Sequence, residues 1–335
     1  DILLQCIDLA SSWKEHRLIF ALGRMADHPR MKVRLAAYRA MARMGNDNLI
    51  PILIRQMKSN RPVHKIYALE GARLYHDERL VPFIKELLTD SSKSVRIFAL
   101  KAIVEQKTDS DVSYLVARRF QDDNNSEVRA RAIEMIGRKG WGRQNYLVHK
   151  AIMDGSDVVR WAAVRSAVAL NDRASAAVIS RQLLSEKDEN LKLAMIEALL
   201  ELRVDDSSNA LAHLVRTDEK EAIRQRAAMA IGNLRIKDAG FALVQAIQKD
   251  PSLPVRLEAA ASLGELGDPR LAESIMDLLT KEGEDRKVLQ LAAMAVIRTG
   301  SDEKVRRLQS VADGLQDAVL AGEIRRMIQE YRSGK

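Results

Sequence analysis

The apolar positions of the chain recur with the spacing of a helix that buries one face. Residues 255–267 read "VRLEAAASLGELG", with apolar or small residues at Val255, Ala259, Leu263 and Leu266. At about 100° per residue, these four positions fall within one quarter of the helix circumference. A shorter amphipathic segment, "RLAESIMDLL" at residues 270–279, follows. The pattern predicts pairs of helices, and no segment shows the sustained two-residue alternation of a strand.

This helix pattern returns along the chain, which indicates a repeat array. We number each copy from its first apolar residue, called offset 0. Successive copies start 30 to 33 residues apart, at Val33, Val63, Val95, Val128, Val159, Leu191, Ile223, Val255 and Val288. The repeat predicts an all-α fold, a right-handed α-solenoid of about nine helix pairs in a single array over residues 1–335. Residues 1–30 should form an irregular first repeat, and residues 301–335 should form capping helices.

The turns of the repeat carry two further regularities. Glycine stands at offset 12 in four copies, a position that ends a helix, namely Gly45, Gly140, Gly267 and Gly300. An acid precedes the cation at offset 1 by six residues, in the pairs Asp90–Arg96, Asp123–Arg129, Asp154–Arg160, Glu186–Lys192, Asp218–Arg224 and Asp250–Arg256. Stacked copies should join these groups into a ladder of charge-assisted hydrogen bonds, with a structural role. Each arginine should lie within hydrogen-bonding reach of a turn Asp in its own or an adjacent repeat, and we expect Arg160 to be the partner of Asp154.

The combination of the turn acid, "VR", "AA" and "LG" resembles HEAT repeats, specifically the short bacterial type named after phycobilisome lyases. The resemblance covers nearly the whole chain. It implies an α-solenoid whose "VR" helices line a concave face, and a protein that works by binding rather than catalysis. Two copies depart from the pattern, because His64 and Leu289 stand where a cation is expected. We therefore expect the ladder to be interrupted at both places.

Offsets 2, 6 and 10 should point away from the core and line the groove. In the first five copies these positions hold seven basic and two acidic residues, and in the last four they hold one basic and three acidic. The net charge of +8 has the same bias, since residues 1–143 contain 26 Lys and Arg against 17 Asp and Glu. We predict that the basic end binds an acidic or elongated protein partner through Arg39, Arg43, Arg73, Lys101 and Arg165. A solvated face whose charges only maintain solubility is the alternative.

The middle of the chain is the least regular part. The segment "GRKGWGRQNY" at residues 137–146 interrupts the helical pattern with three glycines. It places Trp141 in or near a loop, beside Arg138, and Trp161 follows at a groove offset. Exposed Trp beside Arg is typical of a binding hot spot, so we add these residues to the predicted site. Alternatively, both rings fill gaps between repeats.

The sequence offers little for catalysis or metal binding. The six histidines are scattered, no His-Glu dipeptide or phosphate-loop motif occurs, and Cys6 is the single cysteine. We predict no catalytic residues, no metal site and no cofactor, and a non-enzymatic protein-interaction scaffold as the function. One alternative is a nucleic-acid-binding HEAT-like protein with a DNA-glycosylase-like cleft, in which Trp161, Arg165 and Glu134 would be the weak analogue. Another, suggested by the family name only, is a chromophore-lyase-type subunit.

The sequence also bears on membrane insertion, on the compartment and on the N-terminal surface. No apolar run is long enough to span a bilayer, so we expect no membrane insertion. A single thiol is compatible with the cytoplasm, which we favour, and with the periplasm if a leader was removed. The first residues, "DILLQCIDLA", are too apolar for a cap, so we expect either preceding sequence or a partner at that surface.

Overall fold

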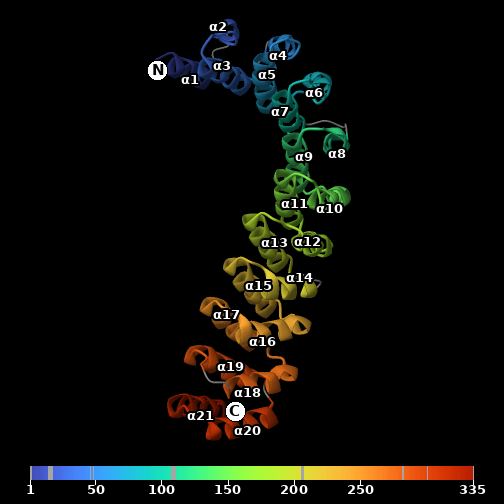
Figure 1. Ribbon diagram of the computed structural model, residues 1–335. Coiled ribbons are helices and arrows are strands. Elements are labelled where there is room, and N and C mark those ends of the chain that lie inside the picture. The colour runs from blue at the N-terminus through green and yellow to red at the C-terminus, as the bar shows by residue number, and fades with distance from the viewer. Residues whose placement is uncertain are drawn as a thin grey trace. The chain divides into compact units, whose positions relative to one another are not determined.

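The computed structural model describes residues 2–13, 18–45, 47, 49–106, 111–204, 207–280, 283–299 and 301–334. All regular secondary structure in these residues is helical, as predicted, and it comprises 21 α-helices with a few single 3-10 turns. The chain divides into two compact units, residues 1–170 and 171–335. Figure 1 shows the order of the helices along the chain.

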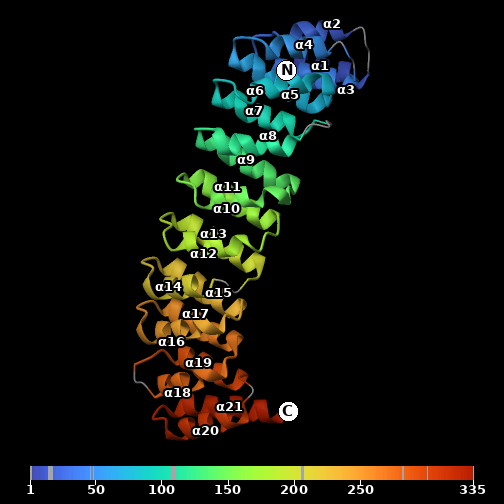
Figure 2. The ribbon, with the colours of Figure 1, turned by 90° about the vertical axis from the view of Figure 1, so that its right-hand side faces the viewer.

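Unit 1 contains α1 followed by five helix pairs. Their bounds are α1 Ile2–Ser12, α2 Ile19–Met25, α3 Met31–Met44, α4 Leu49–Met57, α5 Pro62–Tyr75, α6 Val81–Leu87, α7 Lys93–Ile103, α8 Val112–Asp122, α9 Ser126–Lys139, α10 Asn145–Ile152 and α11 Asp157–Ala169. The odd-numbered helices pack on one another in one row, and the even-numbered helices form a second row beside them (Figures 1 and 2). This stacking of helix pairs is that of an α-solenoid.

Unit 2 repeats the arrangement with five more pairs. Their bounds are α12 Ser175–Leu183, α13 Glu189–Leu202, α14 Ser208–Thr217, α15 Glu221–Asn233, α16 Gly240–Lys249, α17 Leu253–Leu266, α18 Ala272–Leu279, α19 Arg286–Arg298, α20 Asp302–Gly314 and α21 Ala318–Ser333. The nine sequence copies correspond to the odd helices α3 to α19, which confirms the predicted helix pairs. The pair α20 and α21 lies within residues 301–335.

The core consists of the offsets that the sequence pattern indicated. In α17, the residues at offsets 0, 4, 8 and 11 expose at most 3% of their surface, and they are Val255, Ala259, Leu263 and Leu266. Burying each Val or Leu side chain contributes about 1.5–3 kcal/mol of hydrophobic free energy. Alanine at offset 4 of most odd helices lets neighbouring odd helices approach, so within each unit a helix pair shares its core with the next.

The predicted register is wrong by one residue in α5. Val63 is 47% exposed and Leu69 is completely buried, the reverse of what offsets 0 and 6 require. Proline is favoured in the first turn of a helix, and α5 begins at Pro62, which makes His64 its third residue. The third residue is also offset 0 in α3 and α7. This copy therefore starts at His64, and the choice of the β-branched neighbour over histidine caused the error.

Seven of the odd helices end in a left-handed residue at offset 12. The predicted C-caps Gly45, Gly140 and Gly267 have φ angles of 62°, 68° and 57°. Gly300 lies outside the described residues. Non-glycine residues take the same conformation at offset 12 of four more copies, with φ between 49° and 53°, at His76, Asn171, Arg203 and Arg235. His76 is at offset 12 only when its copy starts at His64, which supports the corrected register.

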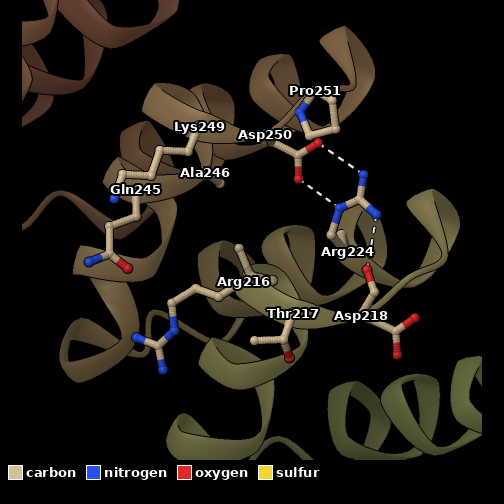
Figure 3. Close-up of a pocket in the computed structure, with 10 residues that line it drawn as sticks. Arg216, Thr217, Asp218, Arg224, Gln245, Ala246, Lys249, Asp250 and Pro251 are labelled. Carbon is tan, nitrogen blue, oxygen red and sulfur yellow. Dashed lines mark hydrogen bonds and ion pairs between the residues drawn. The ribbon is translucent and has the colours of Figure 1, made fainter.

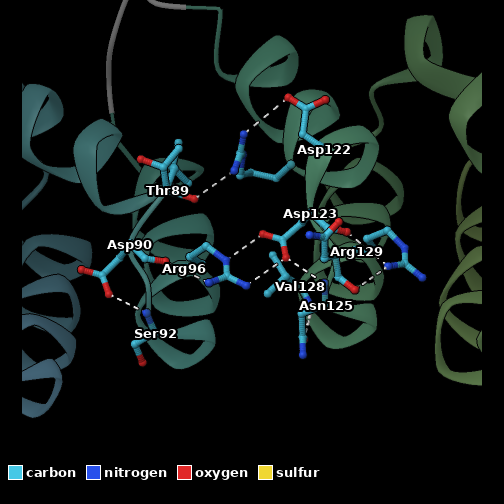
Figure 4. A network of polar contacts seen from close by, with 12 residues as sticks. Thr89, Asp90, Ser92, Arg96, Asp122, Asp123, Asn125, Val128 and Arg129 are labelled. Atoms are coloured by element: carbon cyan, nitrogen blue, oxygen red, sulfur yellow. Dashed lines mark hydrogen bonds and ion pairs between the residues drawn. The ribbon is translucent and has the colours of Figure 1, made fainter.

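The predicted ladder is present in unit 1. Arg96 donates from Nε and Nη2 to the carboxylate of Asp123 at 2.7 and 2.9 Å, and its Nη1 donates to the backbone oxygen of Asp90 at 2.9 Å (Figure 4). Arg129 binds the carboxylate of Asp154 at 3.1 and 2.8 Å in the same manner. We call each such ion pair, between the cation of one odd helix and the turn acid of the next repeat, a rung. A rung thus fastens two successive turns.

Unit 2 contains rungs of the same geometry. Arg224 donates to Asp250 at 2.7 and 3.0 Å and to the backbone oxygen of Asp218, beside a hollow of about 420 Å3 between α14 and α16 (Figure 3). Lys192 Nζ lies 2.5 Å from Asp218, and Arg256 Nε lies 3.0 Å from Glu284. The predicted ladder is therefore confirmed, and its carboxylates are mostly buried.

Two details of the predicted ladder are wrong. The carboxylate of Asp154 binds Arg129, whereas Arg160 donates from Nη1 to the backbone oxygen of Asp154 at 2.9 Å. The turn acid of the arginine's own repeat thus accepts a hydrogen bond through its backbone carbonyl, because the guanidinium extends towards the next turn. Nor is the ladder interrupted at His64, since Lys65 is the cation at offset 1 of α5, 2.5 Å from Asp90.

The carboxylates of the ladder gain from these contacts. Burial raises the pKa of Asp154, but the hydrogen bonds from Arg129 and from the backbone N–H of Ser156 outweigh it and hold the pKa below its ordinary value. The same hydrogen bond raises the pKa of Arg129. Two residues at offset 1 form none of these rungs. Arg34 of α3 packs 4.8 Å from the centre of the Tyr67 ring, and Leu289 of α19 is buried where a cation would stand.

Candidate functional site

The outward side chains of the odd helices form the candidate surface. In unit 1 we define the ridge as the residues at offsets 2, 3, 6 and 10 of α3, α5, α7, α9 and α11. The offset-6 residues of the ridge alternate in charge once α5 is correctly numbered, as Arg39, Glu70, Lys101, Glu134 and Arg165. The ridge therefore carries both signs, and it is less uniformly basic than the sequence pattern suggested.

Arg73 does not occupy the predicted outward row. Because α5 starts at His64, Glu70 takes offset 6 and Arg73 falls at offset 9. Arg73 is 3.1 Å from Glu70 on the same helix, and 38% of its side chain is exposed. The offset-6 position of α5 is thus acidic, and Arg73 reaches the ridge only through its pair with Glu70.

Arg39 and Arg43 lie where the sequence placed them, on the exposed side of α3. Both line a hollow of about 340 Å3 between α1 and α3. Arg43 is 3.1 Å from Asp8 of α1, a pair that is largely exposed and therefore contributes little stability. Arg39 makes no ion pair with any residue that the structure describes.

Lys101 occupies the middle of the ridge and is half-buried. Its ammonium lies 4.6 Å from the centre of the Phe98 ring. Burial lowers the pKa of Lys101, and the nearby cation Arg131 lowers it further, against the opposing effect of Glu70. Lys101 is therefore a cation that lacks full compensation for its lost hydration.

The closest helix crossing on the ridge joins α9 and α11. A Cβ added to Gly137 would lie 2.7 Å from Ser166 Cβ and 2.8 Å from its Cα, so this position has no room for a side chain. Ser166 is buried and donates its hydroxyl hydrogen bond to the backbone oxygen of Ile133 at 3.1 Å. Above this floor lies a hollow of about 360 Å3, the α9–α11 hollow, lined by Arg131, Glu134, Met135, Gly137, Arg138, Arg165, Ser166 and Ala169.

Cations outnumber carboxylates around the α9–α11 hollow. Glu134 lies 2.6 Å from Arg131 and 3.4 Å from Arg165, so a single carboxylate serves two guanidinium groups. Glu105 of α7 is likewise shared, at 2.6 Å from Arg138 and 3.3 Å from Lys139. Four cations therefore share two carboxylates. The pairs also place Glu134, the acid of the glycosylase-like alternative, between two arginines.

The two predicted tryptophans lie on different elements. Trp161 is at offset 2 of α11 and is partly exposed on the ridge. Trp141 is also partly exposed, and it precedes the 3-10 turn η3, Gly142–Gln144, that leads into α10. Arg138 and Trp141 thus flank the left-handed C-cap of α9, whereas Trp161 and Arg165 lie on the neighbouring odd helix.

Sequence reasoning missed the acids that partner the predicted cations. Asp8, Glu105 and Glu134 were visible in the sequence, but the pairing depends on which neighbouring helices touch. Glu70 was missed because of the register error in α5. The spacing of the rungs could have corrected it, since Lys65 precedes Asp90 by 25 residues, as Arg129 precedes Asp154.

The same offsets are different in unit 2. Its offset-6 residues are Glu197, Met229, Ala261 and Met294, so they include no cation. The arginines near this row are paired with acids, Arg226 with Glu197 and Arg298 with Glu265. At offsets 2, 3, 6 and 10, cations thus outnumber carboxylates in unit 1 but not in unit 2.

Comparison with known proteins identifies the repeats. A family model described as HEAT repeats matches residues 50–137, 145–232 and 241–328. The chain belongs to the HEAT-repeat family. The match does not distinguish the phycobilisome-lyase type within HEAT repeats, and no curated protein sequence matches the chain.

Solved structures with similar HEAT-type folds include natural and engineered proteins. The chain is 14% identical to the karyopherin Kap121p with a TM-score of 0.63, and the match covers 96% of this chain and 42% of Kap121p. A chain of the Kap95:Nup1 complex is 14% identical with a TM-score of 0.59, over 95% of this chain and 51% of that one. An engineered protein is 16% identical with a TM-score of 0.52, over 94% and 98%. At these identities the likeness shows the fold alone.

No described helix combines the length and the apolar character needed to cross a membrane.

Proposed function

We propose that the protein is a protein-interaction scaffold that binds an acidic, elongated partner along the ridge of unit 1. The observation that carries this proposal is the distribution of cations. The ridge of unit 1 holds six cations and three carboxylates, whereas the same offsets of α13, α15, α17 and α19 in unit 2 hold two cations and four carboxylates. Complementary charge speeds association and selects partners, so such a difference favours docking on unit 1. The proposed contacts are Arg39, Arg43, Lys101, Arg138, Trp161 and Arg165 of the ridge, with Arg73 and Trp141 beside it.

The similar structures support a protein ligand. Kap121p is known bound to the extreme C-terminus of the protein phosphatase Cdc14p, and Kap95 is known in a complex with Nup1. A stack of helices offers a long surface on which a partner segment can contact several repeats. HEAT-repeat folds generally serve binding, and we propose binding rather than catalysis for this chain.

The test is a double charge reversal at Arg39→Glu and Arg43→Glu. Both side chains are exposed, so helical content and melting temperature should be nearly unchanged. Capture of the native partner from a cell extract, quantified against wild type, should fall to background. The matched control reverses two charges in unit 2, Glu197→Lys and Glu201→Lys, and should retain the partner. If the variant in unit 1 captures every wild-type partner, docking along the ridge is ruled out.

A further inference from the structure

The α9–α11 hollow combines an open floor with an uneven charge balance. The floor is formed by Gly137 and Ser166, where the two helices touch backbone to side chain. Longer side chains stand around this floor, among them Arg131, Arg138 and Arg165. A group that enters the hollow from outside would meet three guanidinium groups before reaching the small residues beneath them.

The guanidinium groups of the hollow retain capacity for another acceptor. Each guanidinium has five N–H donors, and one carboxylate oxygen cannot use them all. Glu134 serves both Arg131 and Arg165, the second at a longer distance of 3.4 Å. Arg138 competes with Lys139 for Glu105. Two positive charges are therefore left without a carboxylate of their own. Arg138 and Arg165 expose 53% and 69% of their side chains, so both guanidinium groups are open to an incoming ligand.

We propose that the α9–α11 hollow binds the carboxylate of an Asp or Glu side chain from an extended peptide segment. The proposal rests on the proposed function and names the anchor point of its partner. An incoming carboxylate would accept hydrogen bonds from Arg165 and Arg138, and it would give the four cations a third carboxylate to share. Arginine binds carboxylates in this bidentate manner because its planar donors match their two oxygens.

The charge pattern of the ridge favours carboxylates over phosphates as the ligand. Single charges of alternating sign run along offset 6, with Glu134 between Lys101 and Arg165. A phosphate would bring about two negative charges close to Glu134 and Glu105 and would be repelled by both. A single carboxylate adds less repulsion, and successive acidic residues of a peptide could meet the cations on neighbouring helices.

Unit 2 provides an internal control with the same floor. A Cβ added to Gly232 of α15 would lie 2.8 Å from Ser262 Cα of α17, as at Gly137. The positions equivalent to Glu134, Arg138 and Arg165 are Met229, Asn233 and Ala261. Three arginines, Arg131, Arg138 and Arg165, form the rim of the α9–α11 hollow. The second crossing has the same packing but only one of them, since Arg226 stands at the position of Arg131 and pairs with Glu197, so it should not bind a carboxylate.

The probe is a fluorescein-labelled peptide of 12 residues that alternates Glu and Ser, titrated by fluorescence anisotropy in 50 mM NaCl at pH 7. Arg165→Gln should weaken binding about five- to tenfold, the net value of one hydrogen bond at a largely exposed side chain. Glu134→Gln should instead tighten binding several-fold, because it removes the carboxylate that competes with the peptide. Arg226→Gln and Glu197→Gln, in unit 2, should leave the affinity unchanged. Melting temperatures of all variants show whether they are folded.

Each other outcome overturns the assignment of the hollow. Weaker binding after Arg39→Glu and Arg43→Glu, with no effect of Arg165→Gln and Glu134→Gln, would move the contact elsewhere on the ridge and leave the scaffold proposal intact. Equal binding of a peptide with Gln in place of Glu would exclude carboxylate recognition. Binding of a phosphoserine peptide but not the Glu peptide would make phosphate the ligand. No binding of any peptide by wild type would reject the hollow, and partner capture would still judge the scaffold.

Discussion

The α9–α11 crossing of unit 1 and the α15–α17 crossing of unit 2 have the same helix packing but different exposed side chains around it. Both have a glycine pressed against a serine, Gly137 on Ser166 and Gly232 on Ser262. Both are spanned by a rung between arginine and aspartate, and both first helices are followed by a left-handed residue. Only the first is surrounded by arginines. The comparison teaches that the glycine–serine contact, the rung and the left-handed C-cap determine how repeats stack. The arginines around the hollow determine what the repeats can bind.

The largest expected effect removes a rung from each crossing. Asp154→Ala in unit 1 and Asp250→Ala in unit 2 should each lower the free energy of unfolding by about 2–4 kcal/mol, because a mostly buried guanidinium loses its carboxylate. Urea denaturation followed by circular dichroism measures both. Asp122→Ala is the control, since Asp122 is 48% exposed beside the ladder and should cost at most about 1 kcal/mol. Equal losses at Asp122 and Asp154 would mean that the rungs are ordinary surface pairs.

The next largest effect comes from adding a methyl group at the two glycines that contact serine. Gly137→Ala and Gly232→Ala should each cost about 1–3 kcal/mol, because the new methyl group would overlap the opposite serine and its backbone. Gly322 of α21 has no atom within 4 Å of an added Cβ. Gly322→Ala should therefore stabilise by up to about 1 kcal/mol through helix propensity alone. Thermal melts compare the three, and a stabilised Gly137→Ala variant would show that the crossing is looser than described.

A third experiment introduces the missing arginines around the α15–α17 crossing of unit 2. Asn233→Arg and Ala261→Arg, made together in an Arg165→Gln background, should restore binding of the acidic probe peptide, with an affinity gain of about tenfold over that background. Arg226 already stands at the position equivalent to Arg131. Fluorescence anisotropy measures the gain, and Asn233→Gln with Ala261→Gln serves as the uncharged control. No gain from the arginines would show that other features of unit 1 are also required.

The smallest effect concerns the caps. Gly140 follows α9 and Arg235 ends the corresponding turn after α15, with φ angles of 68° and 52°. A side chain in this left-handed conformation costs about 1 kcal/mol, so Arg235→Gly should stabilise by about 0.5–1 kcal/mol and Gly140→Ala should destabilise by a similar amount. Denaturation midpoints resolve changes of this size. If Arg235→Gly is destabilising, contacts of the arginine side chain outweigh its backbone strain.

Much of the fold could be predicted from the sequence because packing and spacing are local. The positions of Val255, Ala259, Leu263 and Leu266 define a buried face without knowledge of any partner. The α5 copy failed because Val63 looks more apolar than His64, and the deciding feature was Pro62 at the start of the helix. A proline signal should have outweighed the match of one residue to the repeat pattern.

The candidate site was less predictable because its properties depend on neighbours in space. The sequence indicated that Arg138 and Arg165 point outward, but not that Glu105 and Glu134 would each serve two cations. Similarly, the spacing of Asp154 and Arg160 suggested a pair, although the carboxylate binds Arg129 of the preceding repeat. Distances between adjacent odd helices, set by residues such as Gly137, decide these pairings and are not encoded in the repeat period.

The rungs make the repeats that carry both partners interchangeable in one respect. Each of these repeats brings a cation that reaches forward and an acid that accepts from behind, as Arg129 and Asp123 do in α9 and the turn before it. A gene duplication or deletion that cuts at equivalent offsets would join a donor to an acceptor again and leave no buried charge alone. Such an array can change its length by whole repeats during evolution or in design. An insertion or deletion that is not a whole repeat would separate the cation of a rung from its acid and leave both without a partner. Leu289, which has no charge to pass on, marks where this exchange stops.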